Sequence, residues 1–168
     1  VHGNACRVDW NVVCPHTKEE EVFVFGNPPY LGTKLQENNH KEDVDLVMPD
    51  IAKRRSLDYI SCWFILGGRY IQNSNSSFAF VSTNSITQGE QVSVLWPWLF
   101  EKMVNISFAY TSFKWQNNAK YNAGVTCVII GMTAKNEFSK YIYSDNIAKK
   151  ATPRKIIDSR FSGRLKIN

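Results

Sequence analysis

The 168-residue sequence lacks the features that would mark it as a metal-binding or membrane protein. Its four cysteines have neither Cys-x-x-Cys spacing nor a histidine pattern typical of a zinc site, so we expect reduced thiols and no metal. No apolar run approaches the about eighteen residues of a membrane span, and no signal peptide is recognisable. The sequence therefore predicts a cytoplasmic protein without a membrane partner.

Glycine is scarce in the places where a nucleotide-binding turn would need it. The nine glycines form no Gly-x-Gly-x-x-Gly, because Gly67-Gly68 is an isolated pair and Gly3 lies almost at the first residue. Positive charge is in modest excess, with a net charge of +5. That excess suits a polyanionic partner, although many soluble domains are mildly basic. The apolar fraction of 43% is enough for a core, and the length predicts one domain.

The most informative segment of the sequence is an apolar run that ends in two prolines. Residues 22–25 are β-branched or aromatic and predict a buried strand, which Gly26 ends. Asn27, Pro28, Pro29 and Tyr30 follow; the prolines fix φ and remove two backbone N–H groups. An amide and an aromatic ring are thus held on a stiff loop at a strand's carboxyl end, where open α/β sheets bind ligands. The alternative is an ordinary proline turn with a surface tyrosine.

This loop is suited to methylation of an exocyclic or amide nitrogen. Such a nitrogen is a poor nucleophile because its lone pair is delocalised. The Asn27 side-chain oxygen and the Pro28 carbonyl can accept its two hydrogens and direct the lone pair at an electrophilic methyl group. Tyr30 can stack on the base. Asn27 cannot act as a general base, so the methyl donor must be a strongly activated cofactor.

The remaining pattern predicts alternating strands and helices. We expect a polar loop over 31–55, a helix over 56–72 capped by Ser56, and a buried strand over 77–82. Thr83-Asn84-Ser85 can brace the neighbouring loop by hydrogen bonds or cap a helix over 88–96, which Pro97 should kink or restart. Strands over 106–110 and 125–132 should pair antiparallel, followed by a short strand over 141–143 and a basic tail.

A second candidate site lies in the connection over 111–123, where aromatic side chains alternate with polar and basic ones. Exposed aromatics between lysines suit stacking on an extruded base, together with phosphate contacts. Phe113 and Trp115 point the same way in an extended chain, so sequence does not choose between them. The alternative is that they pack beneath the hairpin. The candidate DNA contacts are Lys114, Asn117 and Lys120.

Several motifs in order along residues 1–133 resemble one family. They are Gly3-Asn4-Ala5-Cys6-Arg7-Val8-Asp9-Trp10, the segment 25–32 around the two prolines, Leu57-Asp58-Tyr59, the run 80–92, Phe113-Lys114-Trp115 and the segment 123–131. Together they resemble the amino-methyltransferase region of type IIG restriction–modification enzymes, the MmeI-like group. The run Ser82-Thr83-Asn84-Ser85-Ile86-Thr87-Gln88-Gly89-Glu90-Gln91 is much narrower in distribution than Asn-Pro-Pro-Tyr alone.

The resemblance implies a fold, a reaction and a cofactor. The fold would be a class I, Rossmann-like methyltransferase sandwich of three α/β layers, of which the chain holds the C-terminal half of the sheet with its antiparallel hairpin. The reaction would be transfer of a methyl group from S-adenosylmethionine to adenine N6 in double-stranded DNA, with the adenine flipped out of the helix. One aromatic of Phe113 and Trp115 would form the wall opposite Tyr30, and Asn4 would contact the cofactor's adenine ring. Asp58 and Tyr59 would lie near the cofactor, although a helix-dipole carboxylate and a packing tyrosine explain them equally well.

In this family the cofactor's glycine-rich turn lies upstream of such a segment, so we expect a piece of a larger enzyme. Residues 1–133 would be part of the catalytic domain and 134–168 a strand and basic tail leading toward a recognition domain. The rest of the parent would supply the cofactor half, the recognition domain and, in some parents, a nuclease. Two alternatives stay open: an RNA or protein-glutamine N-methyltransferase, or a non-catalytic fragment that binds nucleic acid.

Overall fold

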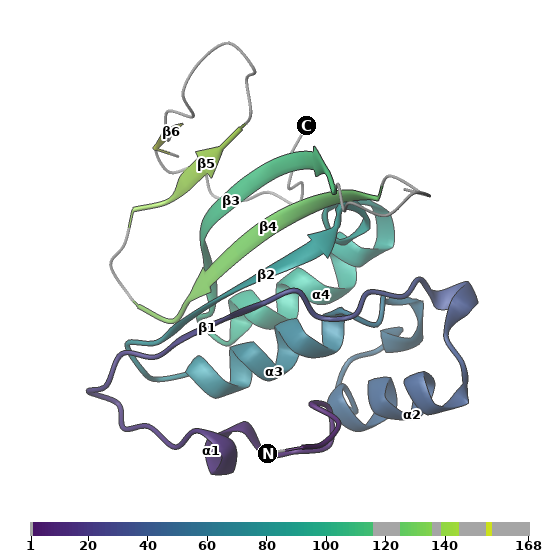
Figure 1. Cartoon of the computed structure of the whole chain (residues 1–168), viewed down its shortest axis with the longest axis horizontal. Helices are drawn as coiled ribbons and strands as arrows, with labels where there is room; N and C mark the ends of the chain where they lie inside the picture. Colours follow the sequence, from purple (N-terminus) through teal and green to yellow (C-terminus); the bar gives the residue numbers. More distant parts are fainter. Residues whose placement is uncertain (1, 116–124, 136–138, 145–153, 156–168) are drawn as a thin grey trace.

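A computed structural model describes residues 2–115, 125–135, 139–144 and 154–155 (Figure 1). The helices are α1 (Trp10–Val13), α2 (Asn38–Val47), α3 (Ser61–Ile71) and α4 (Gly89–Glu101). The 3-10 turns are η1 (Thr33–Leu35), η2 (Arg54–Ser56) and η3 (Asn84–Thr87). The strands are β1 (Phe23–Gly26), β2 (Ser77–Thr83), β3 (Asn105–Lys114), β4 (Thr126–Thr133), β5 (Tyr141–Tyr143) and β6 (Arg154–Lys155).

The strands form one mixed sheet in the order β1-β2-β4-β3-β5-β6. β1 and β2 are parallel, whereas β4 runs antiparallel to both β2 and β3, which confirms the predicted hairpin. β5 pairs parallel with β3, and β6 pairs antiparallel with β5. The carboxyl ends of β1, β2 and β3 therefore meet at one edge of the sheet, at the right of Figure 1. This mixed sheet with its antiparallel hairpin is the arrangement expected for the C-terminal half of a Rossmann-like methyltransferase sheet.

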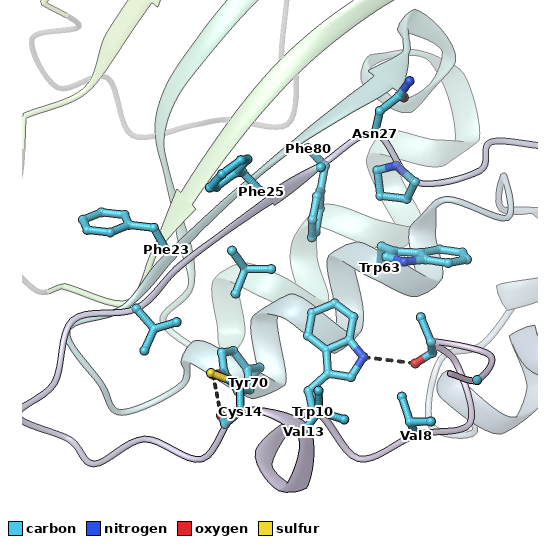
Figure 2. Close-up of a pocket in the computed structure, with 16 residues that line it drawn as sticks. Val8, Trp10, Val13, Cys14, Phe23, Phe25, Asn27, Trp63, Tyr70 and Phe80 are labelled. Carbon is cyan, nitrogen blue, oxygen red and sulfur yellow. Dashed lines mark hydrogen bonds between the residues drawn. The ribbon is translucent and has the colours of Figure 1, made fainter. Parts of the chain in front are cut away.

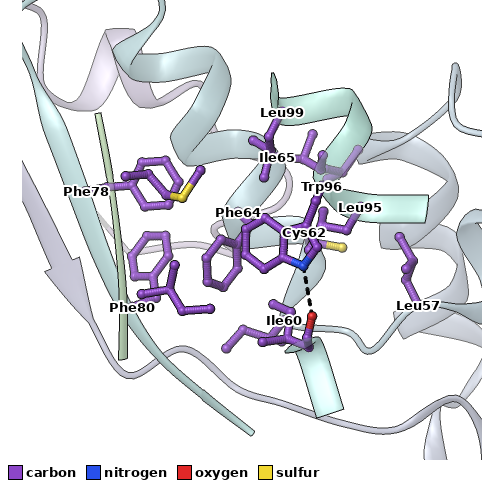
Figure 3. Close-up of a cluster of buried hydrophobic side chains, with 14 of the residues drawn as sticks. Leu57, Ile60, Cys62, Phe64, Ile65, Phe78, Phe80, Leu95, Trp96 and Leu99 are labelled. Carbon is purple, nitrogen blue, oxygen red and sulfur yellow. Dashed lines mark hydrogen bonds between the residues drawn. The ribbon is translucent and has the colours of Figure 1, made fainter. Parts of the chain in front are cut away.

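The core lies between the sheet and the two long helices α3 and α4 (Figure 3). Alternate residues of β2 point into it, because successive strand side chains face opposite sides. Phe64 of α3 meets Phe78, Phe80 and Trp96 edge-on, with ring centroids 5.8, 5.6 and 5.6 Å away. The Trp96 indole N–H donates to the Ile86 carbonyl at 3.0 Å, so the ring is buried without an unpaired donor. This packing fixes α3 and α4 against β2.

The prediction that the first strand is buried is wrong for one of the two faces of that strand. β1 is the end strand of the described sheet, and only Val24 packs toward the core cluster. Phe23 and Phe25 point to the other side and are 63% and 82% exposed. The apolar run predicts a buried strand, but α3 covers a single face of β1.

The predicted polar loop over 31–55 is also wrong, because α2 occupies its centre. The Glu37 side chain accepts from the backbone of His40, whose ring accepts the Glu37 N–H, and this capping box starts the helix. Val44 and Val47, three residues apart, are buried on one face. The polar residues around them masked this short apolar stripe.

The predicted helices α3 and α4 exist with different bounds. α3 begins at Ser61, because Ser56 lies in η2 and its hydroxyl donates to the Lys53 carbonyl. A separate turn precedes the helix, because the Ser61 N–H donates to the Asp58 carbonyl at 2.9 Å. Pro97 does not restart α4, which continues to Glu101 as one helix. The strand predicted over 141–143 is confirmed as β5. Among the described residues, no helix is both long and apolar enough to cross a membrane.

Candidate active site

The segment Asn27-Pro28-Pro29-Tyr30 leaves the sheet at the carboxyl end of β1. Asn27 and Pro29 are exposed, Pro28 is buried and Tyr30 is half-buried. Since neither proline can donate a ladder hydrogen bond, the strand ends at Gly26 and the chain turns away from β2. The Asn27 amide is thereby displayed at the edge where the three parallel-running strands end.

The residue that follows this segment, Leu31, is held at both of its backbone polar groups. Its N–H donates to Asp58 Oδ1 at 2.8 Å. Its carbonyl accepts from the Tyr59 N–H at 3.0 Å and from Gln36 Nε2 at 3.0 Å. Gln36 is buried and also donates to the Leu57 carbonyl at 2.9 Å. The loop is thus attached to the turn that precedes α3.

Asp58 is the centre of what we call the Asp58 cluster, which comprises Leu31, Asp58, Thr83 and Ser85. Its buried carboxylate also accepts from the Ile60 N–H at 3.3 Å, an Asx-type turn that leads into α3. The hydroxyls of Thr83 and Ser85 lie 3.5 Å from Asp58 Oδ2 and 2.6 Å from each other. The sequence predicted that these hydroxyls brace the loop, and they reach it through Asp58.

The aromatic ring of Tyr30 extends to the start of β4. Burial, and after it the neighbouring Cys127 thiol, raise the pKa of the Tyr30 phenol. Cys127 is buried and pairs in register with Phe113 of β3 and Thr83 of β2. Directly paired residues point to the same side of a sheet. The structure therefore brings Tyr30 and Phe113 to the same cysteine.

The second candidate aromatic, Trp115, lies next to Phe113. Their ring centroids are 6.3 Å apart, and Phe113 also meets Tyr110 edge-on at 5.9 Å. The Trp115 N–H donates to the Val125 carbonyl, so both aromatics belong to the end of the β3–β4 hairpin. Lys114 between them is exposed. Asn117 and Lys120 lie outside the described residues.

The third predicted group, around Asn4, is held by a buried carboxylate that the sequence did not identify. We call Asn4, Arg7, Asp43 and Tyr59 the Asp43 cluster. Asp43 of α2 accepts from Asn4 Nδ2 at 2.8 Å, Arg7 Nε at 2.7 Å and the Tyr59 hydroxyl at 2.7 Å. Asn4 Oδ1 in turn accepts the Cys6 N–H at 2.9 Å, so the amide orientation is fixed.

The electrostatics of the Asp43 cluster favour the carboxylate form. Burial acts to raise the pKa of Asp43, but the hydrogen bonds from Asn4, Tyr59 and Arg7 outweigh it, and the pKa is lowered. Burial and the neighbouring Asp43 carboxylate raise the pKa of Tyr59. The phenol therefore remains a donor to Asp43 at neutral pH.

A cavity of about 640 Å³ separates the N-terminal segment from the proline loop (Figure 2). Gly3 and Ala5, on either side of Asn4, line it together with Asn27 and Pro28. Trp10 and Trp63 form further walls, and the Trp10 indole donates to the Ala5 carbonyl at 3.0 Å. The residues that line the cavity include no charged side chain, and Asp58 and Tyr59 are not among them.

The structure thus brings three predicted groups to one edge of the sheet and gives two residues unexpected partners. The Asp58 carboxylate accepts from the Leu31 N–H. Tyr59 donates its backbone N–H to the Leu31 carbonyl and its hydroxyl to Asp43. Sequence reasoning missed Asp43 and Gln36, both of which lie in the segment 31–55 that is predicted as a loop. The spacing of Val44 and Val47 was the one signal for a helix that could present Asp43 inward. The described residues contain no group of three His, Cys, Asp or Glu side chains that could hold a metal ion.

Comparisons with known proteins place this geometry in a family. The model of the family described as MmeI, DNA-methyltransferase domain, matches residues 1–144. A relative named DNA methyltransferase A, from Bacillus subtilis (strain 168), is 51% identical over 148 residues, which are 88% of this chain and 17% of that protein. A solved structure of the Type IIL restriction-modification enzyme MmeI in complex with DNA is similar with a TM-score of 0.82 and 38% identity, over 92% of this chain and 21% of that one. The chain spans about a fifth of the length of these relatives, and it belongs to the MmeI DNA-methyltransferase domain family.

Proposed function

We propose that this chain forms the part of a DNA adenine-N6 methyltransferase that receives the target base, within a larger restriction–modification protein. The observation that carries the proposal is the exposed Asn27 amide, which precedes Tyr30 at the carboxyl edge of the sheet. The paired residues Cys127 and Phe113 lie at the same edge. The family model and the relatives' names, which include DNA methylation and a complex with DNA, support DNA as the partner. Such a protein would act in the cytoplasm.

The acceptor chemistry follows from the groups on the loop. The Asn27 side-chain oxygen and the Pro28 carbonyl each accept one hydrogen of the adenine amine and so localise the nitrogen lone pair. Tyr30 and Phe113 hold the two faces of the base, with Trp115 supporting Phe113. Because the N6 atom is unreachable inside a duplex, the base must be flipped out of the helix. Lys114 lies beside this wall, where it would contact a phosphate.

S-adenosylmethionine is the cofactor that we propose for this site, because it supplies a methyl group activated by a sulfonium centre. The cavity between residues 3–5 and 26–28 is large enough and apolar enough for the adenine ring of this cofactor, and Asn4 stands in the chain between two of its lining residues, Gly3 and Ala5. Asn4 retains one Nδ2 hydrogen beyond the one given to Asp43, and that hydrogen would contact the ring. The residues that line the cavity offer no charged partner for the methionine end of the cofactor. Other residues of the full-length protein would bind that end.

The test uses the full-length protein that contains this chain. Tritiated methyl transfer from S-adenosylmethionine to unmethylated genomic DNA is measured for the wild type and for Asn27→Ala, and the product is digested to nucleosides. We expect N6-methyl-2′-deoxyadenosine from the wild type and a fall in kcat of about 10²- to 10³-fold or more in Asn27→Ala, as for other lost transition-state contacts. Asn75→Ala, an exposed amide at the other end of β2, is the matched control and should keep full activity.

Each other result contradicts a stated part of the proposal. Methylation of cytosine, RNA or a protein glutamine in place of adenine would overturn the assigned substrate. Full activity of Asn27→Ala would overturn the site. A wild type that binds DNA and transfers no methyl group would favour the non-catalytic alternative.

A further inference from the structure

We propose that Asp58 is a positioning residue for methyl transfer, which fixes the Asn27-Pro28-Pro29-Tyr30 loop through the backbone of Leu31. The proposal rests on the proposed function of that loop. It assigns Asp58 a role different from the cofactor contact that the family resemblance implies.

The first support is that every oxygen of the Asp58 carboxylate has protein partners. Oδ1 accepts two backbone N–H groups, from Leu31 at 2.8 Å and from Ile60 at 3.3 Å. Oδ2 faces the hydroxyls of Thr83 and Ser85 at 3.5 Å. The residue is only 5% exposed and does not line the cavity next to Asn27. A carboxylate in this setting acts on the protein and not directly on a ligand.

The second support is that Leu31 is held at two points by adjacent residues. Asp58 accepts its N–H, and the Tyr59 N–H donates to its carbonyl at 3.0 Å. Two hydrogen bonds on opposite sides of one residue fix its orientation as well as its position. The Asp58 backbone is itself held, because its N–H donates to Gln91 Oε1 at 3.1 Å and Gln91 Nε2 donates to the Ser56 carbonyl at 2.9 Å.

The third support is the stiffness of the segment between Leu31 and Asn27. Pro28 and Pro29 have fixed φ angles, so the backbone φ angles that can adjust freely before Leu31 are few. An error in the orientation of Leu31 is therefore passed to Tyr30 and Asn27 and is not absorbed between them. Misplacement of a reacting group by about 1 Å can cost about 10²-fold in rate.

The experiment compares Asp58→Ala and Asp58→Asn with Asp50→Ala in the full-length protein. Asp50 accepts from the indole N–H of Trp98 in α4 at 2.8 Å and pairs with Arg69 of α3 at the surface. Asp50→Ala therefore removes a hydrogen bond to a carboxylate that has no contact with the proline loop. For each variant, kcat and the KM values for DNA and S-adenosylmethionine are measured. Hydrogen–deuterium exchange of the peptide over 27–35 reports the loop directly, whether or not methyl transfer occurs.

We expect Asp58→Ala to lower kcat at least tenfold, to leave the KM for S-adenosylmethionine within about threefold, and to accelerate exchange of the Leu31 amide. Asp58→Asn keeps an acceptor for Leu31 and places its NH₂ toward the two hydroxyls, so it should restore most of kcat and of the protection. Asp50→Ala should match the wild type in kcat and in exchange over 27–35.

Several results would overturn the proposal. A rise confined to the KM for S-adenosylmethionine would indicate a cofactor contact, and an Asp58→Asn variant as inactive as Asp58→Ala would indicate that the charge itself takes part in the chemistry. If Asp58→Ala fails to fold, Asp58→Asn decides by the same two readouts. A wild type without methyl transfer contradicts the proposed function, whereas unchanged Leu31 exchange in Asp58→Ala contradicts the positioning role.

Discussion

Two buried aspartates at the carboxyl edge of the sheet hold their surroundings in different ways. Asp43 binds side chains, including the cationic Arg7, and it joins the N-terminal segment to α2. Asp58 binds mainly backbone N–H groups, and it joins the proline loop to the turn before α3. The first arrangement fixes which segments pack together, and the second fixes the path of one loop. We therefore expect loss of Asp43 to appear first in stability and loss of Asp58 first in turnover.

The adjacent residues Asp58 and Tyr59 connect the two clusters. The Tyr59 hydroxyl donates to Asp43 at 2.7 Å, while its backbone N–H donates to the Leu31 carbonyl at 3.0 Å. The side chain of Tyr59 thus belongs to the Asp43 cluster, and its backbone contacts Leu31 of the Asp58 cluster. Because a substitution changes the side chain alone, Tyr59 offers a way to separate them.

The largest effect on stability should come from Asp43→Ala. This change leaves Asn4, the Tyr59 hydroxyl and Arg7 without their shared acceptor, and breaking such a buried charged network costs on the order of 3 kcal/mol. Asp45→Ala, two residues further along α2, is the matched control. Its side chain is 27% exposed and pairs with Arg54 and Arg55 at the surface, so its loss should cost less than about 1 kcal/mol.

Thermal melting and chemical unfolding of the full-length protein, followed with hydrogen exchange over residues 4–7, measure this difference. Exchange over 4–7 should rise in Asp43→Ala alone. Equal destabilisation by the two substitutions would contradict a special role for the Asp43 cluster.

Tyr59→Phe should have an intermediate effect that is confined to the Asp43 cluster. It removes one of three donors to Asp43 and leaves the backbone contact with Leu31 in place, so we expect a loss of about 1–2 kcal/mol in stability. The kcat for methyl transfer should stay within about twofold of the wild type. A stable protein with a much lower kcat would show that the two clusters are not separable at this residue.

The sequence predicted those parts of the site that depend on residues close together in the chain. The strand that ends in Asn-Pro-Pro-Tyr, the β3–β4 hairpin and the aromatic pair Phe113 and Trp115 each follow from neighbouring residues and short-range periodicity. The partners of the two aspartates do not, because Leu31 lies 27 residues from Asp58 and Asn4 lies 39 residues from Asp43. A hydrogen bond across such a separation depends on the tertiary fold, which a residue's own neighbours do not encode.

The helix α2 shows the same limit in another form. Its polar composition resembles that of a loop, and its helical face consists of little more than Val44 and Val47. Packing against α3 and the capping box at Glu37 decide the conformation in favour of a helix. The burial of Asp43 is therefore a consequence of the tertiary fold and not of its neighbours in sequence.

The pH dependence of stability should distinguish Asp43 by its sign. Because the folded pKa of Asp43 lies below the ordinary value of 3.8, its contribution is fully present well above that value and is lost as the pH falls through the folded pKa. Melting temperatures measured from neutral pH down to about pH 3 should therefore fall less steeply at the acid end in Asp43→Asn than in the wild type. An acid limb of unchanged slope in Asp43→Asn would contradict the depressed pKa.

The smallest effect should come from the hydroxyls that face the far oxygen of Asp58. Thr83 and Ser85 lie 3.5 Å from Oδ2, at the outer limit for a hydrogen bond, whereas the Leu31 N–H approaches Oδ1 to 2.8 Å. If the backbone contact carries the positioning, Thr83→Val with Ser85→Ala should change kcat less than about threefold and leave the exchange of Leu31 unaltered. A tenfold fall in kcat in this double variant would mean that the hydroxyls, and not the backbone of Leu31, set the orientation of the carboxylate. The control of the loop would then begin at the end of β2.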